Sequence, residues 1–374
     1  MPPRDVADRQ PGGDALVADD EALAAGIAAL GSTVGVDTEF MRVRTFHPIP
    51  ALYQLAADTD VVLVDAQAAA TFAPLKALLL DPARAKVMHA CSEDLEVIAV
   101  HLGLRPVNVL DTQLAHAFLT PEYSAGYVKL VDHYLGRTLR QHETRSDWLA
   151  RPLSAAQIRY AREDAAYLVP IWERQRDALD RCGRLQWFEE DMQRVLSTLP
   201  ETPDTWYRTI KGVWRLNRRE LAVLRSLIRW RELEARRRDV PRAWVAADER
   251  LTTLARRDEL RPDDVASVLP RRVAARYGKA LVRAHRAGLA DPEPPVRIPP
   301  PLKRAATAAV KEMRHLAGET ASRFGVAKEL IARKRELEAL YRHYRDHRML
   351  PDWFGGWRAE VLGVALEDVL RKTL

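Results

Sequence analysis

Acidic residues occur at three places along the chain where apolar packing alone does not require them. The first place is the run Val34–Phe40. Within it, Asp37 and Glu39 alternate with apolar or β-branched residues. Residues two apart on a strand project from the same face, so these carboxylates are expected side by side. Like charges at that separation repel unless a cation lies between them. Taken alone, Asp-x-Glu also fits a solvated strand end.

The other two places are expected on helices. Asp94 follows Ser92, a candidate N-cap, and the dipole at a helix start stabilises a carboxylate with or without a metal. Tyr160 and Asp164 are four residues apart and therefore share one helix face. They lie in a segment that begins with the capping-box pattern Ser154-x-x-Gln157. Each feature alone also has a purely structural explanation, as a stabilised helix start or a surface pair.

The surrounding pattern predicts strands early in the chain and helices later. Short β-rich runs between turn residues predict strands over 34–40, 51–57, 61–64, 86–89 and 107–110. Apolar periodicity predicts helices over 19–30, 75–80, 92–102, 112–119 and 154–181. No strand is expected after Arg151. The order predicts one α/β layer that carries the acidic residues, followed by helical additions.

Proline-containing linkers divide the rest of the chain. They are expected at 197–204 and at 291–301, the second of which contains six prolines. Helices are expected over 220–238, 251–255 and 273–285, and several more within 302–374. In the helix over 220–238, the leucines and Trp230 are expected to form the buried stripe and the arginines the exposed one.

Composition and charge narrow the class of protein. The chain has 374 residues and a net charge of +6, but residues 1–200 hold 20 Lys/Arg against 28 Asp/Glu, and the remainder holds 38 against 24. A basic half suits a polyanionic partner, although a solvated basic surface has the same composition. Charges interrupt every long apolar run, and no signal peptide is evident, so we expect a cytoplasmic protein with no membrane contact. The two cysteines form no CxxC motif, which argues against a thiolate zinc site.

The three acidic motifs, in this order, resemble the DEDDy 3′→5′ exonuclease superfamily. The runs His89-Ala-Cys-Ser-Glu-Asp94, Leu110-Asp-Thr-Gln113 and Ser146-Asp-Trp-Leu-Ala-Arg-Pro-Leu-Ser154 narrow the resemblance to the ribonuclease D family. It covers residues 19–195 almost continuously. Residues 220–287 are similar to the helicase-and-ribonuclease-D C-terminal (HRDC) domain. The last 70 residues look like a second, more divergent copy, marked by Leu350–Arg358.

The resemblance implies a fold and a domain plan. The fold is a ribonuclease H-like α/β exonuclease domain followed by two all-α HRDC-type domains. The implied boundaries are a tail over 1–18, the exonuclease domain over 19–198, a first helical domain over 207–290, a linker over 291–301 and a second helical domain over 302–374.

The resemblance also implies the site. Asp37, Glu39, Asp94 and Asp164 are expected to hold two divalent cations, Mg²⁺ or Mn²⁺, which prefer hard oxygen ligands. Asp37 is expected to bridge both ions, with Asp94 holding the second more loosely. Tyr160 is expected to orient the attacking water, since a phenol of ordinary pKa is a poor base at neutral pH. Candidate nucleic-acid contacts are Phe40, His89 and Arg145, although packing accounts equally well for Phe40 and His89.

The implied activity is a 3′→5′ exoribonuclease that releases nucleoside 5′-monophosphates. The expected partner is RNA with a free 3′ end, above all tRNA precursors, and no obligate protein partner is evident. Two alternatives remain: a DNA 3′→5′ exonuclease, and a catalytically silent nucleic-acid-binding protein. The presence of all four carboxylates and the tyrosine argues against the silent protein.

Overall fold

The chain forms two compact units. A computed structural model describes residues 16–374 except 58–59, 69, 140–145 and 199–200. The first unit joins the chain up to Met41 with residues 49–198 and 302–374, and the second joins residues 42–48 with 199–301. The final helical module therefore belongs to the same unit as the sheet. Within the described residues, no helix is both long and apolar enough to cross a bilayer.

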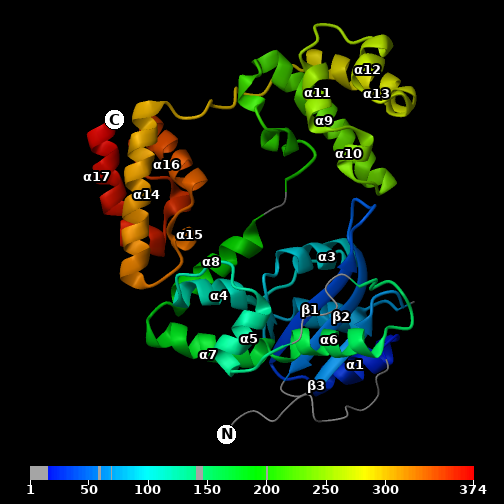
Figure 1. Ribbon diagram of the computed structural model, residues 1–374, viewed down its shortest axis with the longest axis vertical. Coiled ribbons are helices and arrows are strands. Elements are labelled where there is room, and N and C mark those ends of the chain that lie inside the picture. The colour runs from blue at the N-terminus through cyan, green and yellow to red at the C-terminus, as the bar shows by residue number, and fades with distance from the viewer. Residues whose placement is uncertain (1–15, 58–59, 69, 140–145, 199–200) are drawn as a thin grey trace. The chain divides into compact units, whose positions relative to one another are not determined.

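A five-stranded mixed sheet forms the centre of the first unit (Figure 1). The strand order is β3-β2-β1-β4-β5, with β1–β2 and β2–β3 antiparallel and β1–β4 and β4–β5 parallel. The strands are β1 (Thr33–Met41), β2 (Ile49–Ala57), β3 (Asp60–Asp65), β4 (Ala85–Met88) and β5 (Val109–Asp111). All five expected strands are confirmed, and β1 lies in the middle of the sheet.

Helices cover both faces of this sheet. One face is covered by α3, whose His101 Nδ1 lies 2.8 Å from the Tyr53 hydroxyl of β2. The other is covered by α6 and α7, because Gly35 of β1 lets the Ala165 carbonyl and Leu168 approach closely. The helices are α1 (Asp20–Ala29), α2 (Ala73–Leu80), α3 (Ser92–Leu102), α4 (Thr112–Leu119), α5 (Tyr127–Leu135), α6 (Ala155–Ala166), α7 (Leu168–Arg181) and α8 (Leu185–Ser197). The expected mixed α/β domain is confirmed.

The prediction of one helix over 154–181 is wrong, because the structure divides this segment at Tyr167. Its capping box is confirmed: Ser154 accepts from the Gln157 N–H, and the Gln157 side chain accepts from the Ser154 N–H. The break comes from Tyr127, whose hydroxyl donates to the Glu163 carbonyl (2.9 Å) and accepts from the Tyr167 N–H (3.2 Å). An inserted hydroxyl of this kind replaces a helical backbone bond and turns the chain.

The final module packs on the sheet domain through a buried ion pair. Arg358 donates to both carboxylate oxygens of Asp191 on α8, at 2.6 Å each, and the Trp357 indole donates to the same carboxylate. Trp357 also stacks on Trp187 at 4.9 Å between ring centroids. The Leu350–Arg358 motif therefore fixes the module in place. The module contains α14 (Arg304–Phe324), α15 (Lys328–Ile331), α16 (Lys334–His347), η4 (Asp352–Phe354), η5 (Ala359–Gly363) and α17 (Val364–Thr373), bundled together in Figure 1.

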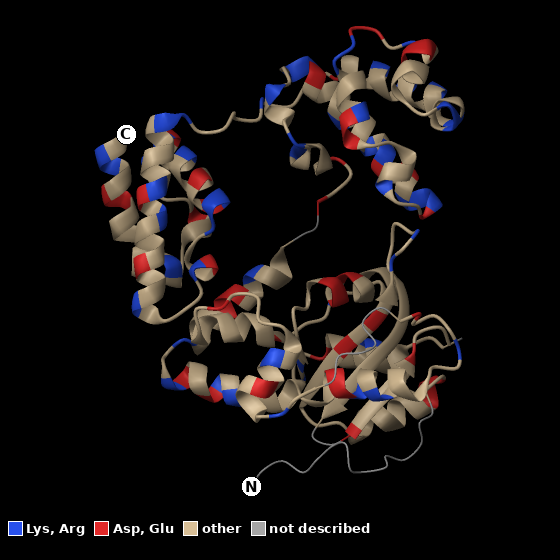
Figure 2. Cartoon of the chain, in the orientation of Figure 1, with Lys and Arg blue, Asp and Glu red and all other residues tan. Residues whose placement is uncertain are grey.

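The second unit is built around one long helix, α9. Its elements are η2 (Trp206–Thr209), η3 (Val213–Arg215), α9 (Arg218–Arg238), α10 (Arg242–Val245), α11 (Asp248–Ala255), α12 (Pro262–Val268) and α13 (Arg271–Leu289). The expected division of α9 into buried leucines and exposed arginines is wrong in part. Arg231 is buried and paired with buried Glu232, whereas Leu233 is exposed. Neighbouring helices enclose that ion pair, and Figure 2 shows basic and acidic positions interleaved along the unit.

The buried pair between Asp191 and Arg358 yields a stability prediction. Asp191→Ala would leave a buried guanidinium unpaired, so we expect the free energy of unfolding to fall by about 3 kcal/mol. Urea unfolding of the full chain measures this. The control is Asp177→Ala, which removes an exposed pair with Arg176 and should cost less than about 0.5 kcal/mol. Equal effects of the two variants would contradict a structural role for the buried pair.

Candidate active site

Three of the predicted carboxylates meet where α6 crosses β1. Asp37 and Glu39 project from the face of β1 that α6 covers, and Asp164 lies on α6 itself. One carboxylate oxygen of each residue lies within 4.8 Å of the others. The alternation of β1 therefore does place the first two side chains together, and the Gly35 contact brings the third to them.

Asp94 approaches the group from the first turn of α3. Its side chain is buried, at 7% exposure, and it accepts a hydrogen bond of 2.6 Å from the Thr38 hydroxyl of β1. Its charge raises the pKa of both Asp37 and Glu39, although it lies outside the 4.8 Å group. The site is thus a group of three carboxylates with a fourth beside it.

Asp111, a carboxylate outside this group of four, binds the backbone of the turn that precedes Asp94. Its two oxygens accept the backbone N–H groups of Ala90 and Cys91, each at 3.0 Å, and it also caps α4. The expected N-cap, Ser92, is wrong: Cys91 holds that position without a side-chain bond, and Ser92 is the first helical residue. Asp111 therefore satisfies donors in the turn that leads into the helix.

Tyr160 lies beside Asp164, as their spacing predicts. The phenol hydrogen-bonds to the Asp164 carboxylate, and its ring packs on Trp148 at 5.9 Å between centroids. Burial first, and then the Asp164 charge, raise the pKa of Tyr160 above its usual value. The one phenol proton is donated to Asp164, and the hydroxyl oxygen can accept a further hydrogen bond.

Burial and mutual repulsion dominate the electrostatics. Burial, followed by Asp94, Asp164 and Glu39, raises the pKa of Asp37 well above its ordinary range. Burial and then Asp164 and Asp94 raise the pKa of Glu39 to about 8. Burial raises the pKa of Asp94 to about 7 against the Thr38 hydrogen bond, and that of Asp164 to about 7 against the Tyr160 hydrogen bond. Asp94 is buried and the other three carboxylates are half-buried, so all four lie in a partly desolvated space.

This environment fits divalent cations. No basic side chain in the described part of the chain is among the main groups that shift the pKa of Asp37, Glu39 or Asp164. The ligand set consists only of hard oxygen atoms, which Mg²⁺ and Mn²⁺ prefer. Bound cations would remove the repulsion that the fold imposes.

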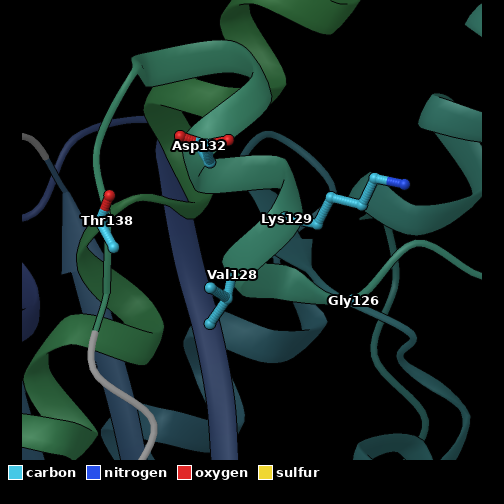
Figure 3. A pocket seen from close by; sticks show the side chains of 5 residues that line it. All are labelled: Gly126, Val128, Lys129, Asp132 and Thr138. Carbon is cyan, nitrogen blue, oxygen red and sulfur yellow. The ribbon is translucent and has the colours of Figure 1, made fainter.

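The weaker site candidates have different surroundings. Phe40 is half-buried at the end of β1, directly after a shift in the β1–β2 register. His89 is half-buried, with Nδ1 3.0 Å from the Thr112 hydroxyl, and burial lowers its pKa. Arg145 lies outside the described residues. A surface pocket of about 470 Å³ beside α5, lined by Gly126, Val128, Lys129, Asp132 and Thr138, contains none of the predicted site residues (Figure 3).

Sequence reasoning did not assign roles to Thr38 and Asp111. Thr38 lies between the two acidic residues of β1, on the opposite face of the strand. A polar residue at a position expected to face the core is the sequence feature that could have indicated its role. Asp111 belongs to the run Leu110–Gln113 and directly precedes a predicted helix, which is a favourable N-cap position. Its bonds to the turn at residues 90–91 depend on the pairing of β4 with β5 and so required the structure.

Comparison with known proteins agrees with this geometry. A family model described as a 3′-5′ exonuclease matches residues 15–180, and an HRDC domain model matches residues 220–284. Ribonuclease D from Pseudomonas paraeruginosa is 39% identical over 344 residues, covering 90% of this chain and 92% of the relative. The crystal structure of Escherichia coli RNase D, described as an exoribonuclease involved in structured RNA processing, has 31% identity and a TM-score of 0.87, covering 96% of this chain and 98% of that one.

The raised carboxyl pKa values predict that stability depends on pH and metal. A carboxyl whose folded pKa exceeds its unfolded value binds more protons when folded, so its contribution weakens as pH rises from about 4 towards about 8. In EDTA, the Tm of the wild type should fall between about pH 5 and about pH 8 more steeply than that of Glu39→Gln. The Tm increase that Mg²⁺ causes should grow over the same window. A pH-independent increase would contradict the mutual repulsion.

The hydrogen bond from Thr38 to Asp94 predicts the effect of a matched pair of substitutions. Thr38→Val removes the hydroxyl at nearly constant volume, so the Asp94 carboxylate loses its orienting donor and divalent-ion affinity should fall about tenfold. Thr38→Ser keeps the hydroxyl and should bind close to the wild-type level. Mn²⁺ titration followed by electron paramagnetic resonance measures both. Equal affinity in Thr38→Val and wild type would show that the bond has no role in ion binding.

Proposed function

The chain belongs to the ribonuclease D family, and from that premise we propose that its four clustered carboxylates hold two divalent cations, Mg²⁺ or Mn²⁺. Family membership makes the protein a 3′→5′ exoribonuclease. The observation that carries the proposal is the approach of Asp37, Glu39 and Asp164 oxygens to within 4.8 Å of one another. Asp94, held by Thr38, would complete the ligand set for the second ion.

Each residue has a separate task in hydrolysis of the terminal phosphodiester. Two divalent ions supply an activated water and stabilise charge on the attacking and leaving oxygens. The charges of all three other carboxylates act on Asp37, which would contact both ions. Glu39 and Asp164 would complete one site, and Asp94 the other. The products are a nucleoside 5′-monophosphate and an RNA shortened by one residue.

Tyr160 would position the attacking water through its hydroxyl oxygen, which can accept a hydrogen bond while the single phenol proton is donated to the Asp164 carboxylate. A phenol of ordinary pKa keeps its proton at neutral pH, and the Asp164 and Trp148 contacts fix the ring. The water proton must therefore leave to another acceptor, such as solvent or a carboxylate. Positioning a reactant in this way contributes to rate through orientation.

The helical modules would bind the RNA. We infer the domain boundaries of the family plan: a tail over 1–18, the exonuclease domain over 19–198, and HRDC-type domains over 207–290 and 302–374 joined by a linker over 291–301. The HRDC match supports the first module, and the four-helix arrangement of the last supports a divergent second copy. The basic balance of residues 201–374 supports phosphate contact. Several arginines there are already engaged, including Arg231 with Glu232.

The proposed substrates are small structured RNAs in the cytoplasm, with tRNA precursors first. A relative described as processing structured RNA supports this assignment. Phe40 and His89 remain candidate contacts for the terminal nucleotide, since an aromatic face accepts any base. Digestion of matched RNA and DNA strands that share one sequence would separate the exoribonuclease from a DNA exonuclease.

Substitution of site residues tests the proposal. Asp37→Asn or Asp164→Asn should abolish mononucleotide release from a 3′ end in Mn²⁺, because each removes a charged ligand. Tyr160→Phe should lower the rate roughly 10²-fold by removing the hydroxyl that orients the water. The assay follows the stepwise shortening of a 5′-labelled RNA and identifies the released nucleoside 5′-monophosphates by chromatography.

The matched control lies in the same helical turn as Asp94. Glu93 is exposed, so Glu93→Gln should leave release near the wild-type rate, whereas Asp94→Asn should reduce it strongly. Full activity in Asp37→Asn would refute the catalytic assignment. Retained RNA binding by a wild-type protein without turnover would instead support a silent nucleic-acid-binding protein.

A further inference from the structure

One buried side chain close to the carboxylates has no hydrogen-bond partner. Gln54 lies on β2 and is fully buried, with 0% of its surface exposed. Neither its Nε2 nor its Oε1 has a hydrogen-bond partner among the described residues. Buried amides are almost always bonded, because an unbonded buried polar group destabilises a fold. An apolar residue of the same length would fill the position without that cost. The amide group therefore calls for an explanation other than packing.

The strand register places Gln54 beside Asp37. The two residues are direct partners in the antiparallel β1–β2 pair, and such partners project from the same face with their Cβ atoms about 4.5–5.5 Å apart. On the other side, Gln54 pairs with Leu63 of β3. Leu63 packs with Ala161 of α6 in one apolar cluster. Gln54 therefore lies on the face of the sheet that α6 covers, which is the face of the carboxylate site.

The neighbours on that face limit what the amide can bond. Leu52 and Leu63 are apolar, and the adjacent Tyr53 lies on the opposite face, where its hydroxyl meets His101. The nearest polar group placed by the register is the carboxylate of Asp37. A carboxylate is an acceptor only, and the Nε2 of an amide is a donor.

We propose that Gln54 is a positioning residue of the cation site. Its Nε2 donates to the Asp37 carboxylate once divalent ions fix the orientation of that carboxylate. Outer partners of this kind orient metal ligands and tune their affinity. The inference rests on the proposed function, because it assigns Gln54 to the same carboxylate site.

The test compares two buried glutamines in the full-length protein. Gln54→Met removes both unbonded polar atoms at similar length. Gln175→Met is the control, because Gln175 is equally buried on α7 and only its Oε1 lacks a partner, whereas its Nε2 donates to the Thr112 carbonyl at 2.9 Å. Two quantities are measured for each: Mn²⁺ affinity by electron paramagnetic resonance, and the Tm in EDTA.

For Gln54→Met we expect Mn²⁺ affinity to fall about tenfold, with a Tm in EDTA equal to or above that of the wild type. For Gln175→Met we expect the reverse, a lower Tm with unchanged Mn²⁺ affinity. Mn²⁺ affinity of Gln54→Met within about twofold of wild type would overturn the inference. A lower Tm of Gln54→Met in EDTA, like that of the control, would also overturn it by showing a structural bond.

A second measurement does not depend on the variant folding. In the wild type, Mg²⁺ should shift the side-chain NH₂ resonances of Gln54 and slow their exchange with solvent, and the resonances of Gln175 should stay unchanged. Unshifted Gln54 resonances at saturating Mg²⁺ would overturn the inference. If wild-type protein binds no Mn²⁺ and releases no mononucleotides, the proposed function itself fails. If the wild type does both and Gln54→Met matches it, only the role of Gln54 fails.

Discussion

Repulsion among four poorly solvated carboxylates is the constraint on which the rest of the structure depends. Burial raises the pKa of Glu39 to about 8 and those of Asp94 and Asp164 to about 7. Burial and the charges of these three carboxylates together raise the pKa of Asp37. A fold that served stability alone would separate these groups or pair them with bases. Protonation or a bound multivalent cation would relieve this repulsion, so stability is expected to depend on both pH and metal.

The secondary structure serves this arrangement through a few local contacts. The small residue Gly35 lets α6 lie close to β1, and the Tyr127 hydroxyl ends α6 shortly after Asp164 so that α7 can turn away. On the other face of β1, Thr38 reaches Asp94. The final module is fixed to the same unit by the buried Arg358 pair and not by the linker over 291–301 alone. Side chains on both faces of one strand thus set the geometry of the site.

Much of this arrangement could be predicted from the sequence, because it depends on short-range periodicity. The period of two placed Asp37 with Glu39, the period of about four placed Tyr160 with Asp164, and the strands followed from turn residues and β-branched runs. Features that depend on long-range contact could not be predicted. The break at Tyr167 needs a hydroxyl 40 residues away, and the burial of Arg231 needs partners from neighbouring helices. Charge along α9 predicted exposure, and tertiary packing overrode it.

The most direct test of the central claim is the position of bound cations. Crystals of the full-length protein grown with Mn²⁺ would be measured at an X-ray energy where manganese scatters anomalously. Two anomalous peaks are expected, one among Asp37, Glu39 and Asp164 and one between Asp37 and Asp94. Peaks confined to other carboxylates, or no peak at this group under saturating Mn²⁺, would contradict it.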